Sequence, residues 1–132
     1  MAITVRDIRA FKERGEHFPM LTAYDAPTAK LLDEAGIPIL LVGDSVGNNV
    51  LGYQETVPVT MEQMLHHAAA VCRGVTNALV VGDLPFMSYQ ASLEDGMRNA
   101  GRFLKEAGTT AVKLEGGARV LELVHHLVEA GI

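Results

Sequence analysis

Ile39-Leu40-Leu41-Val42-Gly43-Asp44 is an apolar run that ends in an acidic residue, and the same form occurs twice more in the chain. The second run is Leu79-Val80-Val81-Gly82-Asp83, and the third is Ala111-Val112-Lys113-Leu114-Glu115. Short apolar runs without alternation are typical of strands that are covered on both faces. Because a helical pattern follows each run, the strands are predicted to be parallel. Their acidic ends should then meet at one rim of the sheet.

The same alternation of helix and strand extends along the whole chain. We expect helices over 4–14, 26–35, 61–73, 93–107 and 119–130, and strands over 18–23, 37–42, 78–81 and 111–114. Thr60 with Gln63, and Ser92 with Asp95, have the cap spacing in which the hydroxyl accepts from the third helical N–H and the later side chain reaches back. An N-terminal helix followed by four strand–helix units predicts an α/β fold of the TIM (β/α)8 barrel type, of which this chain supplies half.

The tripeptide Glu-Ala-Gly ends three of the predicted helices, at 34–36, 106–108 and 129–131. Glycine after a helix adopts the left-handed conformation that a Cβ would strain. A strand follows the first two tripeptides at once, so the third predicts a further strand beyond Ile132. We therefore expect residues 1–132 to be a single partial domain, the N-terminal half of a barrel cut from a longer chain.

Composition limits the classes of partner. Of the 132 residues, 48% are hydrophobic and 20% are charged, which is typical of a globular domain. The net charge is −5, and no cluster of Lys or Arg suggests nucleic acid or an anionic membrane as a partner. No apolar stretch approaches the roughly 20 residues of a membrane span. The first residues are too charged for a signal peptide, so a cytoplasmic protein is expected.

Several groups of residues resemble the ketopantoate hydroxymethyltransferase family. Taken together, in this order and spacing, they match about the first half of the family's sequence. They are Leu21-Thr22-Ala23-Tyr24-Asp25, Leu41-Val42-Gly43-Asp44-Ser45, Gly52-Tyr53 with Thr56 and Pro58-Val59-Thr60, Asp83-Leu84-Pro85-Phe86-Met87, and Val112-Lys113-Leu114-Glu115-Gly116-Gly117.

The resemblance implies an enzyme that uses Mg²⁺ and the co-substrate 5,10-methylenetetrahydrofolate. Such an enzyme adds a hydroxymethyl group to 3-methyl-2-oxobutanoate and gives 2-dehydropantoate, on the route to pantothenate. The matching positions imply metal ligands at Asp44, Asp83 and Glu115, the last directly or through water. They also imply substrate binding by Asp44, Ser45, Asp83 and Lys113. The family's catalytic base is a glutamate in the second half of the barrel, so no base is assigned here, and the family forms large homo-oligomers.

The chemistry of these residue types agrees with such a site. Mg²⁺ prefers oxygen ligands and keeps several waters, so a few carboxylates leave positions for the oxygens of a 2-oxo acid. A metal on the keto oxygen acts as a Lewis acid and stabilises the enolate that attacks the one-carbon unit. Lys113 lies two residues before Glu115, so both side chains point to the same side of the strand. Its ammonium suits a carboxylate or a developing negative charge.

Simpler structural roles are open for several of these residues. Asp44 could simply cap a turn, as Asp often does, and Glu115 could form an ion pair with Lys113 or cap a helix. The neighbouring histidines His66-His67 and His125-His126 point about 100° apart on a helix, which favours surface or packing roles over metal binding. The segment 46–57 is long for a strand–helix loop and suits either a binding loop or a surface excursion.

Two other functions also fit the sequence. The first is another Mg²⁺-dependent barrel lyase that acts on 2-oxo acids, of the phosphoenolpyruvate mutase kind. The second is a non-catalytic half barrel that serves as an assembly unit. Its open face, at Val42, Val81 and Val112 or their neighbours, would favour association with another chain.

Overall fold

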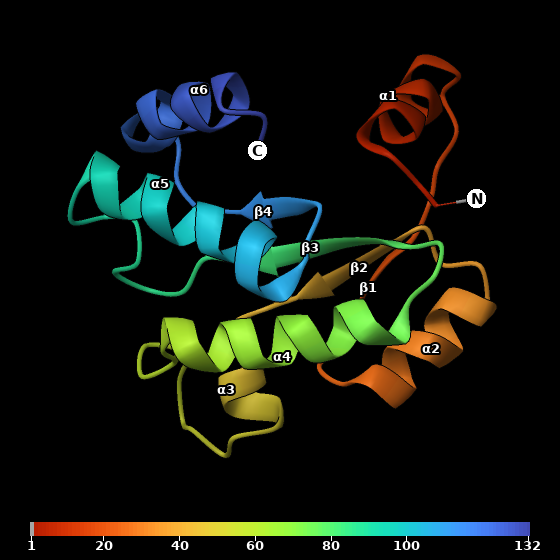
Figure 1. The fold of residues 1–132 in the computed structure, drawn as a ribbon, viewed down its shortest axis with the longest axis horizontal. Coiled ribbons are helices and arrows are strands. Elements are labelled where there is room, and N and C mark those ends of the chain that lie inside the picture. The colour runs from red at the N-terminus through yellow and green to blue at the C-terminus, as the bar shows by residue number, and fades with distance from the viewer. Residues whose placement is uncertain (1) are drawn as a thin grey trace.

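The computed structural model describes residues 2–132 as a four-stranded sheet covered by helices. The strands lie in the order β1-β2-β3-β4, and every neighbouring pair is parallel, as predicted. Each strand therefore pairs with the next one along the chain (Figure 1). The strands are β1 (Met20–Thr22), β2 (Ile39–Val42), β3 (Leu79–Asp83) and β4 (Ala111–Lys113).

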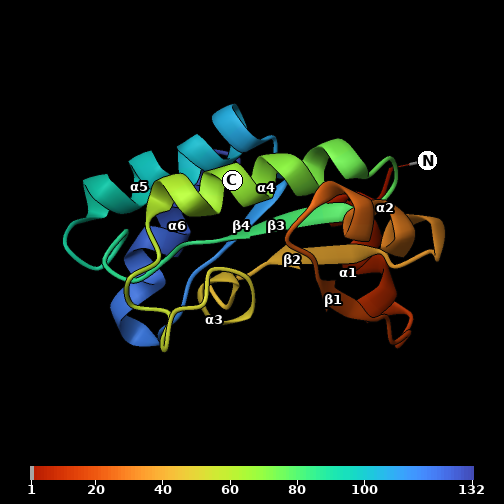
Figure 2. The ribbon, with the colours of Figure 1, turned by 90° about the horizontal axis from the view of Figure 1, so that it is seen from below.

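The helices form close to the predicted ranges, with one addition. They are α1 (Val5–Glu13), α2 (Ala26–Glu34), α3 (Val46–Asn49), α4 (Met61–Gly74), α5 (Leu93–Arg102), the π-helical turn η1 (Phe103–Ala107), the 3-10 turn η2 (Ala118–Val120) and α6 (Leu121–Glu129). The short helix α3 lies in the segment that the sequence predicted to be a long loop. Figures 1 and 2 show α4 along one side of the sheet and α1 on the opposite side. No helix in residues 2–132 is both long enough and apolar enough to cross a membrane.

The predicted helix ends are largely confirmed. The Thr60 hydroxyl accepts from Gln63 N at 3.2 Å, and the Gln63 side chain accepts from Thr60 N at 2.9 Å. Ser92 caps α5 in the same way, but the Asp95 carboxylate binds the Ser92 hydroxyl instead of its backbone N–H. The glycines of the three Glu-Ala-Gly tripeptides have φ angles of +82°, +82° and +88°.

The two faces of the sheet differ in burial. Leu40, Val42 and Val80 are almost completely buried on the side of the helices. The open face was expected at Val42, Val81 and Val112 or their neighbours. Strand alternation turns Val42 toward the helix layer and its neighbour Leu41 toward the other face. The alternate positions Leu41 and Val81 are paired in register on the other face and are only partly buried. Asp83 follows Val81 by two residues, so its side chain lies on this less covered face.

The inward side of α5 and η1 includes most of one apolar pattern in the sequence. Leu93, Met97, Ala100 and Leu104 are at helical spacing. Ala100 is buried, and Met97 and Leu104 are partly buried against the core. The residues that are buried there are Gly96, Ala100, Phe103 and Ala107. Leu93 is 36% exposed. The absence of a side chain at Gly96 lets Leu123 of α6 pack closely against α5.

A carboxylate that the sequence analysis did not single out binds the backbone of the segment that leads into β3. Asp33 in α2 is 8% exposed. It accepts hydrogen bonds from the backbone N–H groups of Thr76 (2.9 Å), Asn77 (3.0 Å) and Ala78 (2.6 Å). Burial disfavours its charge, but these N–H groups hold its pKa below the ordinary value.

We expect Asp33→Asn to lower the free energy of unfolding by about 2 kcal/mol, because an amide has one acceptor oxygen for several donors. The depressed pKa means that the ionised group stabilises the fold above about pH 4, and that this contribution disappears as the pH falls through the lower folded value. Urea unfolding at pH 7 and pH 3 measures both effects. Glu34→Gln is the control, since Glu34 is exposed and its carboxylate lies 3.8 Å from the ammonium of the exposed Lys30 in the same helix. An equal loss for the two variants at pH 7 would contradict the role of Asp33.

Candidate functional site

The three acids that end the predicted strands line one cavity at the carboxyl ends of β2, β3 and β4. This cavity has a volume of about 120 Å³. Thr56 and Val57 contribute to its wall, so part of the long segment after β2 reaches the site. The full lining is Asp44, Thr56, Val57, Asp83, Leu84, Phe86, Tyr89, Gln90 and Glu115.

Asp83 is the central carboxylate of the cavity and is 3% exposed. Its Oδ2 accepts the backbone N–H of Asp44 at 3.0 Å, and its Oδ1 accepts from Lys113 Nζ at 2.9 Å. Burial raises the pKa of Asp83, the negative charge of Asp44 adds to this effect, and Lys113 opposes it. The site therefore holds a buried carboxylate that gains from a nearby cation.

Lys113 supplies a cation between two of the acids. Its Nζ donates to Asp83 Oδ1 and to Glu115 Oε1, each at 2.9 Å. Burial acts against the charge of Lys113, but these two bonds hold its pKa above the ordinary value and lower that of Glu115. The Glu115 side chain is 75% exposed, while its backbone is held by Tyr89, whose hydroxyl accepts from Glu115 N at 2.9 Å.

The residues of this cavity fit a hard divalent cation in part. Asp44 and Asp83 offer carboxylate oxygens from neighbouring strand ends, and Mg²⁺ often binds through one or two carboxylates and several waters. Glu115 is separated from Asp83 by the Lys113 ammonium, which suits contact through water. Within residues 2–132, no three His, Cys, Asp or Glu side chains are arranged to hold one ion together. The metal role of these acids therefore stays a prediction.

Ser45 lies next to this cavity but is not one of its lining residues, and its substrate role stays a prediction. A Cβ built on Gly43 would lie 3.0 Å from Ser45 Oγ and 3.8 Å from Asp83 Oδ2, so both oxygens flank the same point. Ser45 Oγ is 2.7 Å from the hydroxyl of Tyr24, which in turn accepts from Asn49 Nδ2 at 2.9 Å. No role was assigned from the sequence to the Tyr24 hydroxyl or to Asn49.

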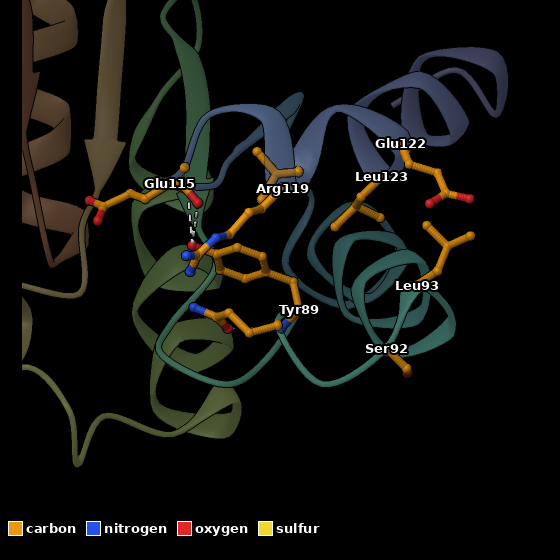
Figure 3. A pocket seen from close by; sticks show the side chains of 10 residues that line it. Tyr89, Ser92, Leu93, Glu115, Arg119, Glu122 and Leu123 are labelled. Carbon is orange, nitrogen blue, oxygen red and sulfur yellow. Dashed lines mark hydrogen bonds between the residues drawn. The ribbon is translucent and has the colours of Figure 1, made fainter.

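A larger pocket adjoins the acidic cavity. It has a volume of about 400 Å³ and shares Tyr89, Gln90 and Glu115 with that cavity. Figure 3 shows Glu115, Arg119 and Tyr89 at one end of it, and Leu93 and Leu123 at the other. The pocket therefore has a polar end beside the acids and a mixed end between α5 and α6, where Ser92 and Glu122 lie with the two leucines. The sequence singled out neither Tyr89 nor Arg119.

The paired histidines have packing and surface contacts, as expected. His67 Nδ1 lies 2.8 Å from the backbone oxygen of Tyr24, and His126 Nδ1 lies 2.8 Å from that of Glu122. His125 pairs with exposed Glu129 at 3.3 Å. The single cysteine, Cys72, is half-buried, and burial raises the pKa of its thiol to about 11. It behaves as a packing residue, which agrees with its expected role.

Comparisons with known proteins bear on both the fold and the family. The family model of ketopantoate hydroxymethyltransferase matches residues 2–132. The 3-methyl-2-oxobutanoate hydroxymethyltransferase of Syntrophus aciditrophicus is 60% identical over 130 residues, which cover 98% of this chain and 48% of the relative. That of Streptomyces coelicolor is 61% identical and is covered over 45% of its length. The chain thus spans about half the length of these curated relatives.

Solved structures with the same fold are more distant in sequence. A 2,3-dimethylmalate lyase of the PEP mutase/isocitrate lyase superfamily has a TM-score of 0.71 at 17% identity, over 98% of this chain and 49% of the lyase. A phosphonopyruvate hydrolase in complex with oxalate and Mg²⁺ has a TM-score of 0.66 at 15% identity, over 96% of this chain and 46% of the hydrolase. This likeness concerns the fold alone, and it confirms that the four strands form half of a TIM barrel.

Proposed function

Because the chain belongs to the ketopantoate hydroxymethyltransferase family, we propose that it forms the metal- and substrate-binding half of a hydroxymethyltransferase. The proposed reaction joins 3-methyl-2-oxobutanoate to the one-carbon unit of 5,10-methylenetetrahydrofolate, with water, and gives 2-dehydropantoate and tetrahydrofolate. The observation that carries the proposal is the cavity in which Asp44, Asp83 and Glu115 meet beside Lys113. Relatives with this activity in their names are about 60% identical to the chain over 130 residues.

The side chains of the cavity suit the parts of such a substrate. Asp44 and Asp83 would hold a Mg²⁺ ion, which when bound supplies a Lewis acid for the keto group of the 2-oxo acid. Lys113 would bind the carboxylate of the substrate or the negative charge that develops when the C3 proton leaves. Ser45 would donate its hydroxyl hydrogen to an anionic oxygen at the same place. The buried position of Asp83 strengthens each of these electrostatic contacts.

The adjoining pocket supports a two-substrate reaction. Its polar end shares residues with the acidic cavity, so a second ligand placed there would lie beside the 2-oxo acid. Its volume of about 400 Å³ is within the usual range for small-molecule sites. We propose that the folate co-substrate enters from this side.

The proposed enzyme needs more than these residues. We propose that the catalytic base comes from the other half of the barrel, because this chain covers less than half of its curated relatives. The uncovered edge of the sheet supports this arrangement, since Met20 and Leu21 of the edge strand β1 point to opposite faces and are 50% and 42% exposed. The same exposed surface supports the expected homo-oligomer.

The lyase alternative has weaker support. It rests on solved structures that share the fold at 14–21% identity. The transferase proposal rests on family membership and on relatives at about 60% identity. The two functions differ in what happens to the substrate, because a transferase labilises the C3 hydrogen of 3-methyl-2-oxobutanoate and a lyase cleaves a carbon–carbon bond of its own substrate.

Hydrogen exchange tests the proposal directly. Residues 1–132 would be joined to the second half of the Syntrophus aciditrophicus relative, and the chimera incubated with 3-methyl-2-oxobutanoate and Mg²⁺ in D₂O. Proton NMR should show loss of the C3 hydrogen at a rate that depends on Mg²⁺. No exchange by a folded chimera, with the intact relative active in parallel, would sink the transferase assignment.

In the same chimera, Lys113→Ala should raise KM for the 2-oxo acid about 30-fold, because a hydrogen bond to a charged group contributes about 2 kcal/mol. Lys105→Ala in η1 is the matched control and should leave KM unchanged, since Lys105 is exposed on a helix of the outer layer. A defect of Lys113→Ala in Mg²⁺ affinity alone would contradict its role in substrate binding.

A further inference from the structure

Ser45 stands at the end of a row of hydrogen bonds that begins outside the acidic cavity. Asn49 Nδ2 donates to Tyr24 Oη at 2.9 Å, and Tyr24 Oη lies 2.7 Å from Ser45 Oγ. Ser45 and Asn49 are joined through the backbone by the bond from Asn49 N to Ser45 O at 3.0 Å. Their spacing of four residues places both side chains on one side of the short helix α3. Tyr24 reaches them from the loop after β1.

The residues around this row fix its members in place. Val46 in the first turn of α3 is completely buried. A Cβ on Gly47 would lie 2.6 Å from a methyl group of Val59, so α3 packs tightly against the chain that leads into α4. The backbone oxygen of Tyr24 lies 2.8 Å from His67 Nδ1 of α4. Tyr24 is thus held at its backbone by one helix and at its hydroxyl by another.

The chemistry of the groups sets the direction of the row. The Asn49 amide nitrogen has only hydrogens to offer, so Tyr24 Oη is an acceptor toward it. A phenol is a better donor and a poorer acceptor than an aliphatic hydroxyl, so the single hydrogen of Tyr24 is best placed on Ser45 Oγ. Ser45 Oγ then accepts from Tyr24, and its own hydrogen is free for another acceptor. Hydrogen bonds in such a row polarise one another, which strengthens the last donor.

We infer that Tyr24 and Asn49 are positioning residues that direct the hydroxyl hydrogen of Ser45 toward an anionic oxygen of the ligand in the Asp44–Asp83 cavity. This inference rests on the proposed function, since it concerns how the carboxylate of a 2-oxo acid is recognised there. A Cβ at Gly43 would lie 3.0 Å from Ser45 Oγ and 3.8 Å from Asp83 Oδ2, so the two oxygens lie on the same side of Gly43. Neither Tyr24 nor Asn49 needs to touch the ligand for this role.

The test measures binding of 3-methyl-2-oxobutanoate and of Mg²⁺ separately to the 132-residue chain, by titration calorimetry. Tyr24→Phe keeps the ring and removes the hydroxyl. It should weaken binding of the 2-oxo acid about fivefold at saturating Mg²⁺ and leave the Mg²⁺ dissociation constant unchanged. If Tyr24 only supported the fold, the change would alter the dissociation constants of both the 2-oxo acid and Mg²⁺. Tyr53→Phe is the matched control, because Tyr53 is a nearby tyrosine whose hydroxyl binds Gln63 instead.

Two Asn49 variants test the direction of the row. Asn49→Ala should cause a smaller loss than Tyr24→Phe, since Tyr24 can still donate to Ser45. Asn49→Asp should cause at least as large a loss as Tyr24→Phe, because a carboxylate accepts the tyrosine hydrogen and reverses the row. Combined with Tyr24→Phe, Asn49→Asp should add little, whereas a simple charge effect would be additive. Asn48→Ala is the control. Asn48 lies beside Asn49 in α3, but its side chain donates to the backbone oxygen of Tyr53.

The outcomes separate the inference from the function on which it rests. Binding of the 2-oxo acid by the unaltered chain with equal binding by Tyr24→Phe would overturn the positioning role alone. No binding by the unaltered chain would overturn both the substrate site and the positioning role. Additive losses of 2-oxo acid affinity in the double variant would overturn the inferred direction of the hydrogen bonds from Asn49 through Tyr24 to Ser45. The effect of Asn49→Asp would then be one of charge alone.

Discussion

Asp83→Asn should lower the affinity of the chain for Mg²⁺ by about a hundredfold or more, and should abolish turnover of any complete enzyme that contains it. The change removes one of two carboxylates on neighbouring strand ends and places a neutral amide 2.9 Å from Lys113 Nζ. Changes to groups that merely support a metal ligand already cost about 10- to 100-fold in affinity, so loss of a ligand should cost at least as much. Titration with Mg²⁺, or with Mn²⁺ followed by electron paramagnetic resonance, measures the effect.

The same change should not unfold the protein. Asparagine can still accept the backbone N–H of Asp44, which binds Asp83 Oδ2 at 3.0 Å. Burial and the charge of Asp44 disfavour the native carboxylate, so its removal should leave the free energy of unfolding equal or raise it. Glu129→Gln is the control, since it makes the same change of charge on an exposed residue at the end of α6. Unchanged activity of Asp83→Asn at limiting Mg²⁺ would remove Asp83 from the metal site.

The meeting of the acids could be predicted because it follows from the backbone alone. Apolar runs locate the strands, parallel strands share one rim, and an acid directly after each run must lie on that rim. Lys113 was expected on the same side as Glu115 because strands alternate, and the two are in fact 2.9 Å apart. Its equal contact with Asp83 depends on the register of β3 with β4, in which Asp83 pairs with Lys113. No local pattern in the sequence specifies that register.

The parts that could not be predicted depend on contacts between distant segments. Helix α3 has only four residues, and its N-cap residue Ser45 makes no side-chain cap hydrogen bond. The sequence therefore contains no recognisable signal for this helix. The bond between Tyr24 and Ser45 joins residues that are 21 positions apart. Asp33 was missed for the same reason, since its partners lie more than 40 positions away. The sequence also could not decide whether Val42 or its neighbour Leu41 faces the open side, because a run without alternation does not tell which residues face which side.

Gly82→Ala should lower the free energy of unfolding by about 3 kcal/mol, because a side chain at this position has no room. Gly82 lies in β3, and a Cβ there would lie 2.6 Å from Cε1 and 2.9 Å from Cγ of Phe103. Phe103 is completely buried in η1, so its ring cannot move into solvent. The strand would have to shift, and Asp83 is the next residue along it. Urea unfolding measures the loss, and Mg²⁺ titration of the same variant measures its effect on the site.

Two further variants isolate the contact between Gly82 and Phe103. Gly101→Ala adds the same methyl group in α5, where no described atom lies within 4 Å of it, and should stabilise the chain by about 0.5–1 kcal/mol. Phe103→Leu leaves space above β3, so the double variant with Gly82→Ala should lose less stability than the two single losses added together. Additive losses would mean that the strand accommodates the methyl group without meeting the ring. In that case the packing of η1 against β3 does not fix the position of Asp83 at the rim.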